Sequence, residues 1–478
     1  MQGVQPYFHF PLTPHQTQVF ARLQDFILHH NARVFILKGQ AGTGKTTLMA
    51  GLIRWLEEQN IEHQLLASTG RAAKILTEKT GGQATTIHSY LYVFKDLNED
   101  LDKMSRLLEK GQHTPTQLRL EFALRTAPDT AEDTVYIVDE ASMISDRPDA
   151  ASFARFGTGN LLSDLLNFKK NSRLIFIGDE CQLPPVNQEF SPALNASYLT
   201  HQYGVEVTQH ELTDIVRQQG TSGIIEASKK IRRQYKYYLP QKYGYLYLRG
   251  FNNISFCTTH ISLINDYILK IRTGNYYDYT LICQTNRHCC EINQVIRQAL
   301  YGSNRQLTAG DLLMITQNNY PTGLMNGDQV IVKAIGHREY RSNLTFIDVR
   351  VESLTTKSSH NFLLIEDVLH SGFTNISALQ HRNLLIDFNQ RMKKQGLRQK
   401  DPAFKEAMMK DPYLNALRAV YGYAITCHKS QGGEWQEVYL YTDNKIQGIP
   451  RPGFYQWWYT AVTRARQQLH VVNDWYIK

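Results

Sequence analysis

Short apolar runs alternate along the chain with longer segments in which apolar residues recur every three or four positions. The runs at 34–37, 135–138 and 174–177 have the length of buried strands, whereas residues 48–59 follow a helical period. Each of these runs ends in a polar turn. Strands that alternate with helices in this way indicate an α/β fold with parallel sheets, in which functional side chains lie at the carboxyl edge.

Two blocks interrupt the alternation. Residues 92–133 turn polar and contain an alternating piece at 118–126, which we expect to form one arm of a hairpin with Phe122 as its candidate aromatic tip. Residues 333–415 read as strands followed by basic helices and predict an insertion with a small β-barrel core. For the basic piece at 388–410 we expect a solvated face, with nucleic-acid contact as the alternative.

The composition is that of a folded globular protein. A hydrophobic content of 42% and a charged content of 20% exclude a disordered or fibrous chain. The 52 Lys and Arg residues outnumber the 44 Asp and Glu residues, and the net charge of +8 suits a polyanionic partner. No apolar run approaches the roughly 18 residues of a membrane span, and the N-terminus MQGVQPYFHF lacks a secretion-signal layout. We therefore expect a cytoplasmic protein without a membrane partner.

The sequence GQAGTGKTT, residues 39–47, is the strongest chemical signal in the chain. It lies between an expected strand and an expected helix, and its glycines let backbone N–H groups curl around a polyphosphate at the helix N-terminus. Lys45 then reaches the β- and γ-phosphates of ATP, and the Thr46 hydroxyl binds Mg²⁺. The alternative is a glycine-rich turn that binds nothing. The expected nucleotide-binding residues are Gly39, Gln40, Ala41, Gly42, Thr43, Gly44, Lys45, Thr46 and Thr47.

Other polar side chains follow neighbouring strands and so converge on the same edge. Asp139 and Glu140 end the strand at 135–138, where Asp139 can hold Mg²⁺ through water and Glu140 can orient or deprotonate the attacking water. Gln182, after the next strand, can sense the γ-phosphate with its amide. Gln16, on a helix upstream of the loop, can select adenine with its amide, the alternative being a solvated helix residue.

Eight motifs occur in a fixed order between Thr13 and Arg466: GQAGTGKT, ASTGRAA, TTIHS, IVDEASM, IGDECQLPPV, LTDIVRQ, HKSQGGEW and YTAVTRAR. In this order the chain resembles a superfamily 1 helicase of the 5′→3′ branch, of the RecD and Dda type within the UvrD/RecD-like P-loop helicases. The loop alone is shared by many nucleotide hydrolases, but the ordered set is far more specific.

This resemblance implies two RecA-like P-loop domains with parallel sheets and with ATP and Mg²⁺ in the cleft between them. Residues 1–91 and 134–210 correspond to the first domain, and 211–332 with 416–478 to the second. The block at 92–133 corresponds to a wedge insertion. The block at 333–415 corresponds to an SH3-like β-barrel insertion with a helical extension.

The resemblance also assigns roles to single residues. The catalytic set is expected to be Lys45, Asp139, Glu140 and Gln182 from the first domain with Arg217 and Arg464 from the second. Glu434 is expected to brace Arg464 or the nucleotide ribose. The residues expected to contact DNA are Thr69, Arg71, Thr86, His88, Thr426, His428, Lys429 and Ser430.

The activity implied by the resemblance is that of an ATP-dependent DNA helicase that translocates 5′→3′ on single-stranded DNA and unwinds duplex DNA. The alternatives are an RNA or ribonucleoprotein-remodelling helicase, a translocase whose short 92–133 block fails as a wedge, and a regulatory P-loop nucleotide hydrolase. The expected partners are single-stranded DNA, duplex junctions and a single-strand-binding, replication, recombination or repair protein. The protein is expected to be a monomer.

Overall fold

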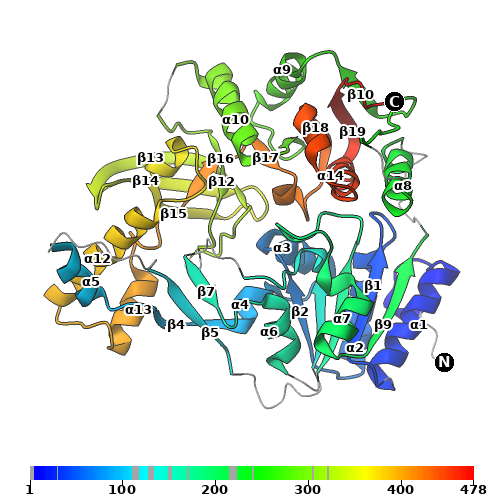
Figure 1. Ribbon diagram of the computed structural model, residues 1–478, viewed down its shortest axis with the longest axis horizontal. Coiled ribbons are helices and arrows are strands. Elements are labelled where there is room, and N and C mark those ends of the chain that lie inside the picture. Colours follow the sequence, from blue (N-terminus) through cyan, green and yellow to red (C-terminus); the bar gives the residue numbers. More distant parts are fainter. Residues whose placement is uncertain are drawn as a thin grey trace.

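The computed structural model describes residues 5–29, 31–109, 118–126, 134–148, 153–169, 172–214, 223–238, 242–303, 306–319 and 322–478. It has two α/β halves, one below the other in Figure 1, and an antiparallel lobe beside them. We call these parts the first half, the second half and the third lobe. No helix in the ranges above is long and apolar enough to cross a lipid bilayer.

The first half is built on a parallel sheet with strand order β3-β2-β6-β8-β1-β9. Its inner strands are buried on both faces, because each face packs against a separate apolar core. The strands are β1 (Val34–Gly39), β2 (His63–Ala67), β3 (Ala84–Thr86), β6 (Val135–Asp139), β8 (Arg173–Gly178) and β9 (Val207–Leu212). The helices are α1 (Pro14–Leu28), α2 (Lys45–Glu58), α3 (Gly70–Thr80), α4 (Ile87–Leu91), α6 (Leu161–Phe168) and α7 (Ala196–Tyr203).

The second half repeats this design with a parallel sheet of order β10-β19-β18-β11-β17. Its apolar core contains Trp457 and Trp458, which are buried on the last helix. The strands are β10 (Ile254–Cys257), β11 (Tyr279–Cys283), β17 (Ala424–Thr426), β18 (Trp435–Tyr441) and β19 (Ala465–Val472). The helices are α8 (Gly223–Lys236), α9 (His260–Ile271), α10 (Asn286–Tyr301) and α14 (Gly453–Val462). The expectation of an α/β fold with parallel sheets is confirmed.

The third lobe contains an antiparallel sheet of order β15-β14-β13-β12-β16. The sheet extends beyond the expected insertion at 333–415, because its first and last strands lie outside that range. Its strands are β12 (Leu312–Ile315), β13 (Gln329–Arg341), β14 (Leu344–Ser353), β15 (Ser359–Ile365) and β16 (Ala419–Tyr421). Helices α11 (Glu366–His370), α12 (Ala378–Lys394) and α13 (Pro402–Lys410) connect the last two strands.

Within 92–133 the chain forms β4 (Tyr92–Leu97), α5 (Leu101–Glu109) and β5 (Leu120–Leu124), while residues 110–117 and 127–133 lie outside the described ranges. Strand β5 pairs antiparallel with β4, so the predicted hairpin arm is present, and β7 (Ala154–Phe156) extends this small sheet. Phe122 lies opposite Phe94 and stacks on Phe156, with 4.7 Å between ring centroids. It packs within the sheet, and the expectation of an aromatic tip at Phe122 is wrong.

Helix α5 packs against α12 and α13 of the third lobe, at the far left of Figure 1. The contact is an apolar core whose members include Leu101 and Met104 on α5 and Phe388 and Phe404 on the other two helices. Polar contacts flank it: Asn389 Nδ2 donates to Asp102 Oδ1 at 2.7 Å, and Leu101 N donates to Gln399 Oε1 at 2.9 Å. One side of the basic 388–410 piece is therefore a packing interface, while Lys393, Lys394 and Lys400 of the charge run are exposed, as expected for a solvated face.

We expect Phe388→Ala to lower the free energy of unfolding by about 3–5 kcal/mol, because the change leaves a cavity in this core. Urea unfolding followed by circular dichroism measures the loss. Phe373→Ala is the matched control, since that ring is 73% exposed and its removal should change stability by no more than about 0.5 kcal/mol. Equal effects of the two changes would contradict the packing described for α5, α12 and α13.

Candidate nucleotide and nucleic-acid sites

The loop between β1 and α2 has the backbone curl that its glycines predict. Gly42 and Gly44 both have a φ of 84°, a conformation that favours glycine. A Cβ atom on Gly39 would lie 2.7 Å from Thr43 Oγ1, so the closed loop leaves no room for a side chain there. Helix α2 begins at Lys45, and its N-terminal N–H groups face the same loop. The arrangement fits the phosphates of a nucleotide.

Two side chains hold the loop from either side. Lys45 Nζ donates to the carbonyl oxygens of Gly39 and Gln40 at 2.6 and 3.1 Å. Gln16 is buried; its Oε1 accepts from Thr13 N at 3.1 Å, and its Nε2 donates to Thr43 O at 3.0 Å. The interpretation of Gln16 as a solvated residue is wrong, because this amide both caps α1 and ties it to the loop.

The two carboxylates stand at the carboxyl end of β6. Asp139 Oδ1 accepts from Glu140 N at 2.9 Å, and Glu140 has a left-handed backbone with φ 50° and ψ 41°. Burial and the neighbouring Asp139 raise the pKa of Glu140 to about 7, against the opposing charges of Arg464 and Lys45. Burial likewise raises the pKa of Asp139. A carboxyl that titrates near neutral pH can take up and release a proton under working conditions.

Arg464 approaches this site from the second half, close enough for its charge to lower the pKa of Glu140. Its side chain is buried, where Nε donates to Thr460 O at 3.0 Å and Nη1 to Gly433 O at 3.1 Å. Arg217, the other arginine expected here, lies outside the described residues.

Glu434 pairs with Arg466 instead of Arg464, and its expected contact with the nucleotide ribose stays a prediction. Its carboxylate accepts from Arg466 Nε at 3.0 Å. The Glu434–Arg466 pair lies at the surface, whereas Arg464 is buried at the end of α14, where Thr460 O and Gly433 O accept its hydrogen bonds.

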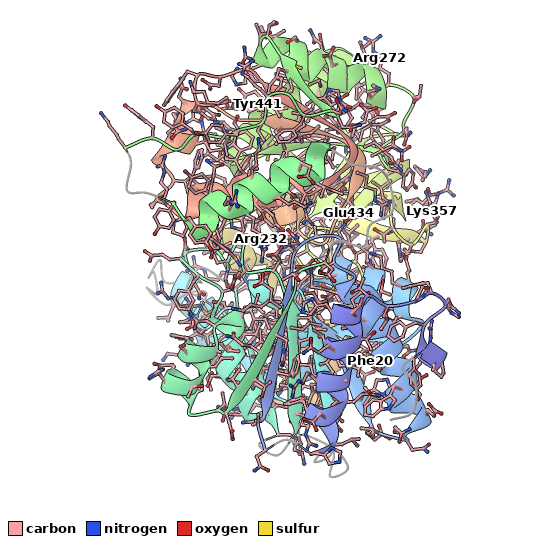
Figure 2. All side chains as sticks on the ribbon, turned by 90° about the vertical axis from the view of Figure 1, so that its right-hand side faces the viewer. Phe20, Arg232, Arg272, Lys357, Glu434 and Tyr441 are labelled. Carbon is pink, nitrogen blue, oxygen red and sulfur yellow. The ribbon has the colours of Figure 1, made fainter. Side chains whose placement is uncertain are left out.

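A set of contacts that sequence reasoning missed joins the two halves at the cleft. Asp179 is buried after β8, and it accepts from Arg232 Nη1 at 2.6 Å and from Tyr459 OH at 2.5 Å. Figure 2 places Arg232 at the boundary between the halves. Tyr459 OH also accepts from Ala41 N of the loop at 3.4 Å. Asp179 and Tyr459 lie within quoted motifs, but nothing marks Arg232 among the other cations of α8.

The adjoining Gln182 lies in the same interface. Its backbone carbonyl accepts from Gln456 Nε2 at 3.2 Å, and Leu183 N donates to Thr460 Oγ1 at 2.9 Å. Gln182 Oε1 is buried and has no hydrogen-bond partner within the described part of the chain. Since buried polar atoms are normally paired, this free acceptor at the cleft fits a site that takes a polar ligand.

The threonines expected to contact DNA cap structural elements. Thr69 Oγ1 accepts from Ala72 N at the start of α3, and Thr86 Oγ1 accepts from Ser89 N at the start of α4. Thr426 Oγ1 accepts from Lys429 N at 3.4 Å. These hydroxyls stabilise helix or turn starts, and DNA contact by them stays a prediction.

The other expected contacts differ in how far they face solvent. His88 packs edge-on against Phe156, and burial lowers its pKa to about 4, so the ring is neutral. Ser430 is fully buried and donates to Cys427 O. Lys429 Nζ donates to Asn326 Oδ1, and burial lowers its pKa to about 8. Burial also lowers the pKa of His428.

The structure nevertheless brings together the protein segments that are expected to contact DNA. A Cβ atom on Gly70 would lie 2.1 Å from Met325 Cβ, and one on Gly432 would lie 3.6 Å from Ala72 Cβ. The N-terminus of α3 therefore contacts both the turn before β13 and the loop before β18. Arg71, on the first turn of α3, points into the space between them.

Two domain families match the chain. Residues 11–239 match the AAA domain family, and residues 421–472 match the UvrD-like helicase C-terminal domain family. The first match covers the first half, and the second contains the HKSQGGEW and YTAVTRAR motifs.

Individual relatives are helicases by name. The ATP-dependent DNA helicase Dda of Enterobacteria phage T4 is 25% identical over 62% of this chain, and the RecD2 DNA helicase of Deinococcus radiodurans is 31% identical over 32%. The matches span 58% and 16% of those proteins, less than two thirds of either. A Pif1 helicase structure is 17% identical, with 97% of this chain and 92% of that chain covered and a TM-score of 0.52. The resemblance to 5′→3′ superfamily 1 helicases is confirmed.

We expect Glu140→Gln to stabilise the protein at pH 8 but hardly at pH 5. The folded-state pKa of Glu140 lies above the unfolded value of 4.5, so the folded protein binds the Glu140 proton more tightly than the unfolded chain does. This tighter proton binding stabilises the folded wild type at low pH, and the stabilisation is lost as pH rises from about 4.5 to 7. Glutamine cannot lose a proton. The difference in unfolding free energy between the variant and the wild type should therefore grow by on the order of 1–3 kcal/mol from pH 5 to pH 8.

Urea unfolding at the two pH values measures this gap. Glu57→Gln on α2 removes an exposed carboxylate and is the control, whose effect should not differ between pH 5 and pH 8. A Glu140→Gln gap that stays constant with pH would contradict the burial described for this carboxyl.

Proposed function

We propose that the chain is an ATP-dependent DNA helicase that moves 5′→3′ along single-stranded DNA and unwinds duplex DNA. The observation that carries this proposal is the approach of Arg464 from the second half to Glu140 of the first half at one cleft. A motor needs such an arrangement, because hydrolysis then depends on how the two halves are placed. Dda and RecD2 are ATP-dependent DNA helicases by name, and the Pif1 structure concerns unwinding of forked DNA.

In this proposal the two halves are RecA-like domains, formed by residues 1–91 with 134–210 and by 211–332 with 416–478. The strands of both parallel sheets fall within these ranges, apart from the last two residues of β9. The β4-α5-β5 segment within 92–133 is the wedge. The third lobe is the SH3-like insertion with its helical extension, enlarged by β12 and β16.

The loop and the first turn of α2 are proposed to hold the triphosphate of ATP. Lys45 leaves its two carbonyl partners for the β- and γ-phosphates, while Thr46 and Asp139 hold Mg²⁺. Gln16, already bonded to the loop, is proposed to offer its remaining N–H to adenine. The Mg²⁺ ion neutralises phosphate charge when it is bound.

Glu140 is proposed as the base that takes a proton from the attacking water. Its pKa near 7 leaves a large protonated fraction at neutral pH, and the charge of Arg464 opposes that protonation. When the halves close, Arg464 favours the carboxylate form, which is the active base. Closure therefore raises the fraction of Glu140 in the carboxylate form at the same time as it brings an arginine to the developing negative charge.

The contacts of Asp179 support coupling between the nucleotide and the second half. Tyr459 bonds to Asp179 and to Ala41 N of the loop, so phosphates that enter the loop compete with its hydroxyl. Gln431, in the HKSQ turn, donates to Leu183 O at 3.0 Å and links this cluster to the expected DNA contacts.

The alternatives are less well supported. A regulatory P-loop protein does not need Arg464 and Tyr459 from a second parallel sheet. A translocase without strong unwinding assumes a weak wedge, but α5 has an apolar core with α12 and α13 that stiffens this block. RNA as the polymer stays open, since helix starts and small hydroxyls select phosphates without distinguishing the sugar.

The proposed partners are single-stranded DNA and duplex junctions, with a single-strand-binding, replication, recombination or repair protein. We propose a monomer that acts in the cytoplasm. The net charge of +8 supports a polyanionic partner.

We expect wild-type protein to unwind a duplex with a 5′ single-stranded tail and to leave one with a 3′ tail intact. Lys45→Ala should abolish unwinding and lower ATP hydrolysis by at least about 10²-fold, because the loop loses its charge for the phosphates. A fluorescence strand-separation assay measures both duplexes. Lys229→Ala, a half-exposed lysine on α8, is the control and should retain activity. Unwinding from the 3′ tail alone would overturn the direction.

We expect single-stranded DNA to stimulate ATP hydrolysis by the wild-type protein more than RNA of the same sequence does. A coupled ATPase assay with both polymers, at one salt concentration, measures the ratio. Equal stimulation would favour the remodelling alternative. Hydrolysis indifferent to either polymer would favour the regulatory nucleotide hydrolase.

A further inference from the structure

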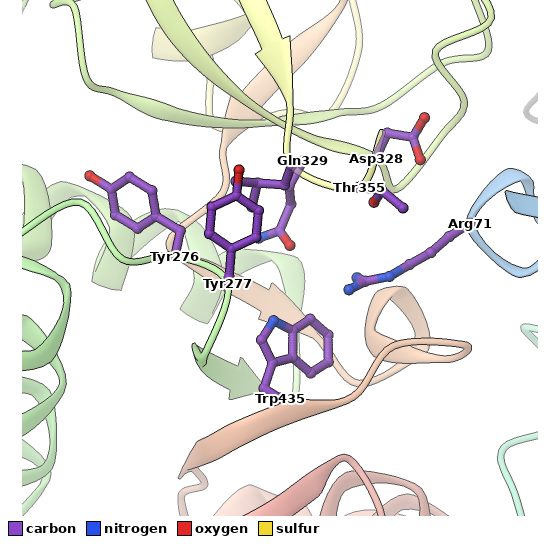
Figure 3. A pocket seen from close by; sticks show the side chains of 8 residues that line it. Arg71, Tyr276, Tyr277, Asp328, Gln329, Thr355 and Trp435 are labelled. Carbon is purple, nitrogen blue, oxygen red and sulfur yellow. The ribbon is translucent and has the colours of Figure 1, made fainter. Parts of the chain in front are cut away.

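A pocket lies where the two halves and the third lobe meet, on the side of α3 (Figure 3). Arg71 of α3 forms one wall, Tyr276 and Tyr277 before β11 form another, and Trp435 at the start of β18 lies below them. The third lobe contributes residues 328–329 and 354–355. The volume of about 230 Å³ is several times that of a water molecule, roughly 30 Å³, yet below the roughly 300 Å³ at which drug-sized sites begin. It therefore fits one ring-sized group.

The inner end of the pocket carries an unpaired donor and an unpaired acceptor. Arg71 Nε and Asp328 Oδ1 are buried and have no hydrogen-bond partner among the described residues. The other Asp328 oxygen is occupied, since it accepts from Lys74 Nζ at 2.5 Å and Met325 N at 2.9 Å. An unpaired donor and an unpaired acceptor among the lining residues indicate a ligand edge that both donates and accepts.

The position of Arg71 depends on its neighbours in the second half. Its guanidinium carbon lies 4.5 Å from the centre of the Trp435 ring. A Cβ atom on Gly433 would lie 2.7 Å from that same carbon. A side chain at Gly433 would displace Arg71, so the glycine keeps the guanidinium over the indole.

The mouth of the pocket is aromatic and basic. Tyr277 is 37% exposed, and Lys357 Nζ lies 3.1 Å from the centre of its ring. Lys357 belongs to the turn between β14 and β15, where Lys357 N donates to Ser353 O at 3.0 Å. Lys357 therefore covers one face of Tyr277, and the other face can stack on a base while the lysine offers its charge to the neighbouring phosphate.

We propose that this pocket accepts one base of the single strand on which the motor moves, with Tyr277 as its stacking face. The inference rests on the proposed function, because it assumes a bound strand. A nucleobase has the required size, a flat face, and adjacent donor and acceptor atoms on its edge. All four bases meet these conditions, so the pocket takes a base without selecting its sequence.

The location supports a base of the bound strand. Gly70, which packs on Met325, precedes the lining residue Arg71, and Gly432 packs on Ala72, which follows it; both glycines lie in motifs that contain expected DNA contacts. The walls come from both halves and from the third lobe, so any movement of one half against the other changes the width of the pocket. A base seated there is held in one arrangement of the halves and released in another.

The test measures binding of a single-stranded oligonucleotide in which one abasic site is moved a position at a time. With the wild type we expect affinity to fall about five- to tenfold at one position, where the missing base removes its stacking. Tyr277→Ala should weaken binding of the intact oligonucleotide by a similar factor. In this variant an abasic site at that position should cause no further loss of affinity. Gly433→Ala, which displaces Arg71 on the opposite wall, should also remove the position-specific loss.

Tyr340→Ala is the matched control, because Tyr340 is 70% exposed on β13 and lies outside the pocket. It should keep the wild-type profile. The pocket proposal would be overturned if the position-specific loss of affinity persisted in Tyr277→Ala. It would also be overturned if the wild type bound the intact strand tightly but lost no affinity at any abasic position. Either result would leave the helicase proposal standing. Failure of the wild type to bind any single strand would overturn both.

Discussion

A buried carboxylate that needs groups from the other half of the molecule determines how this structure closes. Asp179 belongs to the first half, but Arg232 and Tyr459 of the second half supply two of its hydrogen bonds. Removing one partner of a buried charged pair typically costs about 3–5 kcal/mol, so an open cleft must rehydrate this carboxylate. The closed arrangement in turn places Arg464 near Glu140 and Tyr459 near the phosphate loop.

The parts that could be predicted from the sequence depend on local pattern. Strands β1, β6 and β8 are apolar runs of the right length, and the loop after β1 needs its glycines wherever it occurs. The extent of the third lobe could not be predicted in this way, because β16 pairs with β12 across about a hundred residues and no local signal marks the two strands as one sheet. In the basic piece at 388–410 the exposed lysines could be predicted from the charge pattern, but the apolar side that packs on α5 could not, because its partner lies some three hundred residues earlier in the chain.

The candidate site shows the same division. Asp139 and Glu140 could be placed from the strand that precedes them, since a strand fixes where its next residues emerge. The partner of Glu434 could not, because its ion pair with Arg466 forms only when β18 and β19 come together in the folded chain. Gln16 was placed near the loop, but its burial arises from a cap and a tertiary hydrogen bond that only the folded chain contains. Contacts between the two halves, such as that of Arg232 with Asp179, could not be predicted, because neither the sequence around Arg232 nor that around Asp179 indicates the partner.

The packing of α5 on α12 and α13 has a consequence for synthesis on the ribosome. The sheet of the first half is complete once β9 has emerged, yet Leu101 and Met104 on α5 lack their partners until Phe404 follows, some three hundred residues after Leu101. At about 5–20 residues per second, that delay is roughly 15–60 s. During it the part of the α5 apolar face that α12 and α13 later cover stays open to solvent, and exposed apolar surface of this kind favours chaperone binding and aggregation.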